Sequence, residues 1–156
     1  MTRTESKKLN ELLSIFNDVT DREERSMLLI GYADRFREVP SSVAHRPFPE
    51  NHRVPYCESE AYVWLVPNPD GTAQPVFAVE NPSGISAKAL AAILTDTLSG
   101  APPQVIASVS PEIVTEIFRE NISMGKGMGL TGMVEMMRGL ARRLSDNGEG
   151  SANPSS

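Results

Sequence analysis

The chain has 156 residues, of which 40% are hydrophobic and 22% charged, and its formal net charge is −5. This length and composition fit one globular domain with room for a core, and the negative charge argues against nucleic acid or an anionic membrane as a partner. No apolar run approaches the roughly 20 residues that span a bilayer. Since the first residues lack the apolar segment of a signal peptide and there is a single cysteine, we expect a cytoplasmic protein without disulfides.

The first third of the chain predicts two helices and then a long loop. Apolar residues at helical spacing place the first helix over 5–18. Thr20 and Glu23 have the spacing of a capping box, so a second helix is expected over 21–37. The residues expected to face the core are Met27, Leu28, Ile30, Gly31, Ala33 and Phe36. A proline follows this helix, and residues 38–56 form a loop of the length that is typical of functional or mobile segments.

A β-hairpin follows the loop. Residues 61–66 and 75–79 are rich in β-branched and aromatic side chains, and the turn between them contains Asp70 and Gly71, a dipeptide that supplies positive φ angles. Both strands carry apolar residues on both faces. We therefore expect helices to cover one face of the sheet and other residues to shield part of the second face.

Helices dominate the rest of the chain. Apolar periodicity and proline positions predict helices over 85–98, 111–120 and 127–144. One helical turn is expected to start at the prolines near 102, and Ser110 is the expected N-cap of the helix that follows. Methionines concentrated around the last helix indicate flexible filling of the core, with a surface for a partner protein as the alternative.

The glycine-rich run near the C-terminus is not predicted to bind a cofactor. Residues 127–132 satisfy the glycine pattern of dinucleotide-binding loops, but a helix precedes them where that motif needs a strand. A single cysteine also excludes a Cys-rich zinc site.

Residues 145–156 have the composition of a disordered tail, so one domain is expected over 1–144.

Cys57 lies where the long loop meets the first strand. Three prolines precede it within ten residues, and the polar and charged residues around it are Glu50, His52, Arg53, Glu58 and Glu60. Such a segment runs over a protein surface, and an exposed thiol is open to reaction. The alternative is a small apolar residue packed in the core. We favour a reactive nucleophile at Cys57.

The segment around Cys57 resembles the SufE family, in which a Gly-Cys-x-Ser-x-Val-Trp motif lies at a loop-to-strand junction. Cys57, Ser59, Val63 and Trp64 match the motif, whereas Tyr56 replaces the glycine and two additional residues precede the Val-Trp pair. An insertion of two keeps the strand parity. Further runs similar to those of the family follow in the same order, at 85–90, 99–102 and 126–130.

The resemblance covers about residues 7–143 and implies an α+β fold, with a small curved antiparallel sheet packed on one side by helices, similar to the iron–sulfur scaffold fold. It implies a third strand, which we expect within 49–57. It also implies that Cys57 takes persulfide sulfur from a cysteine desulfurase, stimulates that enzyme, and passes the sulfur to an iron–sulfur scaffold protein. The pyridoxal phosphate belongs to the desulfurase, so this chain needs no cofactor or metal of its own.

Four residues are expected to support the thiol or bind the partner. Tyr56 and Ser59 flank it in the motif, and Lys126 takes the position of a family arginine, which keeps the cation but loses the bidentate fork. Lys126 steers an acidic loop in one interpretation and is a solvated residue at a helix start in the other. His52, like His45, either raises the thiolate fraction of Cys57 or is an exposed loop histidine.

Two other functions remain open from the sequence. One is a small hydrolase with Cys57 as nucleophile and His45 or His52 as base. The other is a non-catalytic binding module in which Cys57 is incidental. For the sulfur acceptor we expect two states: Cys57 tucks against the sheet near Tyr56 at rest, and its loop swings out when the desulfurase docks. Such a loop opens more often than the core.

Overall fold

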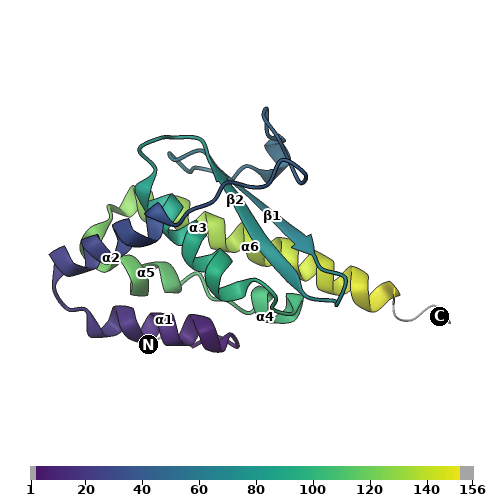
Figure 1. Ribbon diagram of the computed structural model, residues 1–156, viewed down its shortest axis with the longest axis horizontal. Helices are drawn as coiled ribbons and strands as arrows, with labels where there is room; N and C mark the ends of the chain where they lie inside the picture. The colour runs from purple at the N-terminus through teal and green to yellow at the C-terminus, as the bar shows by residue number, and fades with distance from the viewer. Residues whose placement is uncertain (1–2, 152–156) are drawn as a thin grey trace.

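The computed structural model describes residues 3–151, and it has an α+β fold (Figure 1). In chain order the elements are α1 (Lys7–Asp18), α2 (Arg22–Asp34), η1 (Glu50–His52), β1 (Ala61–Pro67), β2 (Ala73–Val79), α3 (Ile85–Leu98), α4 (Pro103–Ala107), α5 (Ile113–Phe118), η2 (Arg119–Asn121) and α6 (Met124–Ser151). The predicted fold class is confirmed, and the predicted hairpin and the helix over 85–98 are present.

The hairpin lies across α3 and α6. β1 packs against α6 and β2 against α3, while α1 contacts α5 and α3 on the far side of the helical layer. Figure 1 shows α6 running along the length of the molecule beneath the hairpin. The antiparallel register pairs Val63 with Phe77 and Trp64 with Val76. Because of this register, Val63 and Phe77 join the main core, and Trp64 and Val76 face the other way.

The long loop covers part of the second face of the sheet, where the sequence predicts shielding without naming the segment that provides it. Phe48 packs on Tyr62 and Trp64, with ring centroids 5.2 and 5.3 Å apart. Arg46 lies over the Phe48 ring and forms ion pairs with Glu38 and with Glu80 at the end of β2. These contacts fix the first part of the loop to the sheet.

The predicted third strand is wrong. Within 49–57 the structure has the 3-10 turn η1 and a single bridge between Arg53 and Tyr62 of β1. The N–H of Val54 donates to the carbonyl of Ala61 at 2.9 Å, but the next residue is Pro55, which has no N–H to continue the pairing. The sheet described by the structure therefore has two strands.

Several predicted helix ends differ from the observed ones. Asp21, not Thr20, caps α2, since its carboxylate accepts from the N–H of Glu24 at 3.0 Å. Glu112, not Ser110, is the residue before α5. The last helix continues to Ser151, so the expected tail is wrong over 145–151, and residues 152–156 lie outside the described part of the chain.

The predicted core stripe of α2 is confirmed for Leu28, Ala33 and Phe36, which pack against the main core, and wrong for the other three residues. Met27 is 74% exposed and Ile30 is exposed, whereas Leu29 and Arg25 are buried. Arg25 is only 2% exposed. The buried face of the helix therefore includes a guanidinium besides its apolar residues.

Arg25 joins three helices through backbone carbonyls. Its guanidinium donates to Phe16 and Val19 at the end of α1, and to Ile117 in α5 at 2.7 Å. Carbonyls at the end of a helix have no partner within that helix, so one cation satisfies several of them. Burial lowers the pKa of Arg25, and the neighbouring Arg119 lowers it further.

We expect Arg25→Met to lower the free energy of unfolding by about 2–4 kcal/mol, because each buried carbonyl left without a donor costs roughly 1–3 kcal/mol. Chemical denaturation measures this loss. The matched control is Arg22→Met at an exposed position of the same helix, which should change the stability by less than about 0.5 kcal/mol. Equal effects of the two substitutions would contradict the role assigned to Arg25.

Candidate functional site

Cys57 lies in a tight turn between η1 and β1. The turn is closed by two backbone hydrogen bonds, from the N–H of Val54 to Ala61 and from the N–H of Glu60 to the carbonyl of Cys57. Tyr56 and Glu60 have φ angles of 58° and 52°. Such left-handed angles cost a non-glycine residue roughly 1–2 kcal/mol, so the turn contains strain on both sides of the thiol.

The thiol is buried, which contradicts the surface segment expected around Cys57 but agrees with the tucked resting state expected for a sulfur acceptor. Cys57 is 8% exposed and belongs to the main core cluster. It lies against α6, where a Cβ built on Gly129 would be only 3.3 Å from its Sγ atom. Tyr56, which was expected beside the thiol, is 89% exposed. The prediction of a resting thiol against the sheet near Tyr56 is therefore corrected to a thiol seated on α6.

A small polar cavity of about 110 Å³ opens beside Cys57. Its lining residues are Cys57, Glu58, Ser59, Asn81, Ser83, Gly84, Ile85, Ser86, Lys126, Gly129 and Leu130. Two of the residues expected to support the thiol, Ser59 and Lys126, thus meet it in one cavity. Three segments far apart in the sequence form the walls.

Asn81 links two of these segments. Its backbone N–H donates to the carbonyl of Ser59 at 3.1 Å, and its side-chain amide donates to the carbonyl of Glu58 at 3.3 Å. Its Oδ1 atom accepts from the N–H of Ser83 at 2.9 Å. Asn81 was not predicted as a site residue, because its only local signal in the sequence is that of a strand end.

The charged residues that line the cavity are Lys126 and Glu58. Lys126 contributes an ammonium group, and the N-terminal end of α3 reaches the cavity at Ile85 and Ser86. The N-terminus of a helix carries a partial positive charge. Glu58 is the acidic residue in the lining. An anionic sulfur held at Cys57 would therefore face a cation and a helix dipole of the favourable sign.

The histidines have other contacts. His52 Nδ1 lies 2.8 Å from the carbonyl of Val63, so this nitrogen carries the proton and donates it. The ring stacks on Trp64, with centroids 5.3 Å apart. His45 is exposed beside the carbonyl of Arg46. Neither histidine is among the residues that line the cavity at Cys57 within the described chain, and the structure gives His52 a role in anchoring η1 to β1.

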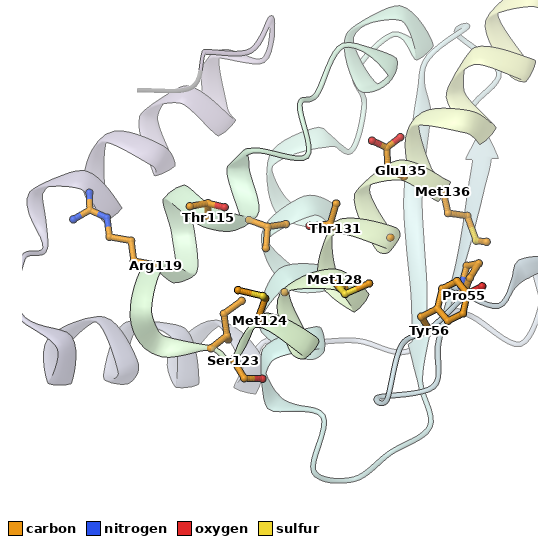
Figure 2. Close-up of a pocket in the computed structure, with 14 residues that line it drawn as sticks. Pro55, Tyr56, Thr115, Arg119, Ser123, Met124, Met128, Thr131, Glu135 and Met136 are labelled. Carbon is orange, nitrogen blue, oxygen red and sulfur yellow. The ribbon is translucent and has the colours of Figure 1, made fainter.

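A larger apolar groove of about 880 Å³ borders the other side of the turn (Figure 2). It runs between α5 and the first turns of α6, with Arg119 at one end and Pro55 and Tyr56 at the other. Met124 and Met128 lie in it and are exposed. The prediction that these methionines fill the core is therefore wrong for this pair, while Met133, Met137 and other apolar residues of α6 are buried.

The glycine-rich run over 127–132 is helical throughout, since it lies inside α6. Within the described part of the chain, no group of three or more His, Cys, Asp or Glu residues could hold a metal ion. The residues that line the cavity at Cys57 include this thiol, several polar side chains, one cation and one carboxylate.

This arrangement defines a class of small α+β protein, in which a helix-backed hairpin carries one thiol in a polar cavity. A family model described as "SufE: Fe-S metabolism associated domain" matches residues 10–141. The chain therefore belongs to the SufE family, as its resemblance predicts, and is associated with iron–sulfur metabolism.

Two curated relatives agree with this assignment. The chain is 26% identical over 129 residues to "Cysteine desulfuration protein SufE" of Plasmodium vivax, covering 82% of this chain and 49% of the relative. It is 26% identical over 143 residues to "SufE-like protein 1, chloroplastic/mitochondrial" of Arabidopsis thaliana, covering 91% of this chain and 37% of the relative. The chain thus spans half or less of the length of these relatives.

A solved structure has the same fold. The solution structure of a hypothetical protein from Thermus thermophilus superposes with a TM-score of 0.71 at 23% identity, covering 90% of this chain and 98% of that one. Among the helices in residues 3–151, none is long and apolar enough to cross a bilayer. The cytoplasmic location stays a prediction.

We expect Asn81→Ala to raise the rate of Cys57 alkylation by iodoacetamide roughly fivefold, because losing about 1 kcal/mol of hydrogen bonding makes the turn open more often. Thiol labelling followed by mass spectrometry measures the rate. Asn68→Ala is the control, since the Asn68 amide bonds Thr72 in the hairpin turn and its loss should leave the rate unchanged. An unchanged rate in Asn81→Ala would contradict the linking role of Asn81.

Proposed function

We propose that this chain is a sulfur acceptor, which takes persulfide sulfur from a cysteine desulfurase onto Cys57 and passes it to an iron–sulfur scaffold protein. The observation that carries the proposal is the position of Cys57. It is the only thiol of a SufE-family chain, and it lies beside a cavity that contains Lys126 and the N-terminal end of α3.

The transfer step exchanges one S–S bond for another. After the Cys57 thiol has lost its proton to solvent, the thiolate attacks the outer sulfur of the persulfide on the desulfurase cysteine. A new S–S bond forms at Cys57 Sγ, and the S–S bond of the donor breaks. The donor cysteine leaves as a thiolate with the bonding electron pair, so the step needs no external oxidant or reductant.

The cavity supports storage of the sulfur. Its volume of about 110 Å³ exceeds the roughly 30 Å³ that one water occupies in the liquid, so one added sulfur atom fits. The persulfide anion would face Lys126. Because the chain has no second cysteine, no internal thiol can attack the persulfide and release its sulfur through a disulfide.

Transfer also requires the turn to open. A thiol that is 8% exposed cannot reach the active site of another protein. Aromatic contacts of Phe48 and His52 hold the preceding loop on the sheet, so the moving part is the strained turn itself. The exposed groove with Met124 and Met128 borders this turn, and it offers a desulfurase an apolar surface next to the thiol.

The hydrolase hypothesis is not supported by a comparable observation. A cysteine hydrolase needs a base within hydrogen-bond reach of its nucleophile, and His52 is engaged with Val63 and Trp64 instead. The binding-module hypothesis differs from the acceptor in one measurable respect, because it predicts that Cys57→Ala leaves the stimulation of the desulfurase unchanged.

We expect Cys57 to gain one sulfur atom when the chain is incubated with a cysteine desulfurase and cysteine, because it is the only thiolate available for attack. Intact-mass spectrometry without reductant detects the gain, and peptide mapping assigns it. The control is Cys57→Ser, which should stay unmodified and should also abolish stimulation of desulfurase turnover. No gain with an active cognate desulfurase, or a gain that persists in Cys57→Ser, would exclude the acceptor function.

We expect the amides of residues 56–60 to exchange hydrogen faster than those of β1 in the free protein, because the backbone bond that they donate is local to the turn. Binding of the desulfurase should slow this exchange in the turn. Hydrogen exchange with mass spectrometry provides both measurements. Equal protection of the turn and of β1 in the free protein would indicate a rigid turn, which would have to present Cys57 without rearrangement.

A further inference from the structure

The turn that carries the thiol rests on two glycines of α6. A Cβ built on Gly129 would lie 3.2 Å from Cys57 Cα and 3.3 Å from its Sγ. A Cβ built on Gly132, one helical turn further, would lie 2.9 Å from Cγ1 of Val54 and 3.6 Å from the carbonyl oxygen of Pro55. Contacts under 3.0 Å essentially never occur for real Cβ atoms, and contacts between 3.0 and 3.4 Å are unusually tight.

This close approach is what buries the thiol. At Gly129 the backbone of Cys57, and not the end of a flexible side chain, is the nearest atom. Even a methyl group on Gly129 would therefore push the turn away from the helix by a few tenths of an ångström. Interiors are packed densely enough that extra volume of this size is not absorbed without displacement.

The same two glycines place no side chain that would hinder separation of the turn from α6. No side chain of α6 extends from positions 129 and 132 into the turn, so the turn can leave the helix without a rotamer change at those positions. Gly132 also lines the apolar groove together with Pro55 and Tyr56. One face of the turn is thus seated on the helix, and the adjoining residues border the groove.

We propose that Gly129 is a positioning residue that sets the equilibrium between the buried and the exposed conformation of the Cys57 thiol. Gly132 supports the same contact between the turn and α6. A larger residue at 129 shifts the equilibrium toward the exposed thiol. The inference rests on the proposed function for its biological meaning, since it describes how sulfur acceptance is restrained. The effect of Gly129 on the exposure of the thiol involves only this chain, so its test needs no partner protein.

The test measures the rate of Cys57 alkylation by iodoacetamide in the full chain carrying Gly129→Ala. We expect the rate to rise about tenfold or more relative to the wild type, as overpacking of one methyl group implies. The matched control is Gly139→Ala in the same helix, where a built Cβ has no atom within 4 Å. This variant should keep the wild-type rate, although its alanine favours the helix.

Thermal unfolding of each variant separates local from global effects. If Gly129→Ala does not fold, a double-mutant cycle with Gly132→Ala and Val54→Ala decides the question, because the Val54 truncation removes the Cγ1 atom that the new methyl would meet. Each single substitution should speed alkylation, and the double variant should be slower than either. Equal rates for wild type and Gly129→Ala, equal acceleration in Gly129→Ala and Gly139→Ala, or simple additivity in the cycle would overturn the proposal.

The outcome is independent of the acceptor test. Faster alkylation in Gly129→Ala without any sulfur gain from a desulfurase would support the positioning role and exclude the proposed function. Sulfur gain on Cys57 with an unchanged alkylation rate in Gly129→Ala would support the proposed function and exclude the positioning role. Slower alkylation in Gly129→Ala would also overturn the proposal, since it would mean that the methyl group fills space over a seated thiol.

Discussion

The thiol-bearing turn can lie against α6 only because Gly129 and Gly132 leave no side chain between helix and turn. The rest of the site depends on this contact. With Cys57 seated on the helix, Lys126 on the preceding turn of α6 comes to the same cavity as Ser59. The hairpin in turn holds the turn at its other end, because β1 packs on α6 and begins four residues after the thiol.

Under the proposed function, the cavity would hold one reactive group between acceptance and transfer. Polar groups from the thiol turn, the strand end at Asn81 and the start of α6 surround it. The cation and the dipole of α3 suit an anionic sulfur, and burial limits access by solvent and oxidants. Opening concerns a short turn, which is held by its own closing hydrogen bonds and by those from Glu80 and Asn81.

The two faces of the sheet have separate roles. The inner face belongs to the core over α3 and α6, while the outer face binds Phe48 and His52. This division keeps the long loop attached although it lacks regular structure, and it confines motion to the residues after η1. The ion pairs of Arg46 with Glu38 and Glu80 add a polar attachment at the rim.

The sequence by itself determined the elements that depend on neighbours along the chain. The periodicity of 85–98, the Asp70-Gly71 turn and the pairing of strand patterns are local, and the motif around Cys57 identified the family and the thiol. Only the tertiary structure decided which side chains are buried and which segments come into close contact. Arg25 is buried because carbonyls of α1 and α5 need its donors, and Cys57 is buried because a glycine of a helix distant in sequence permits contact. His52 is engaged by Trp64, and Pro55 ends the pairing that a third strand would need. Burial and close approach are properties of two surfaces, and only the folded chain brings both together.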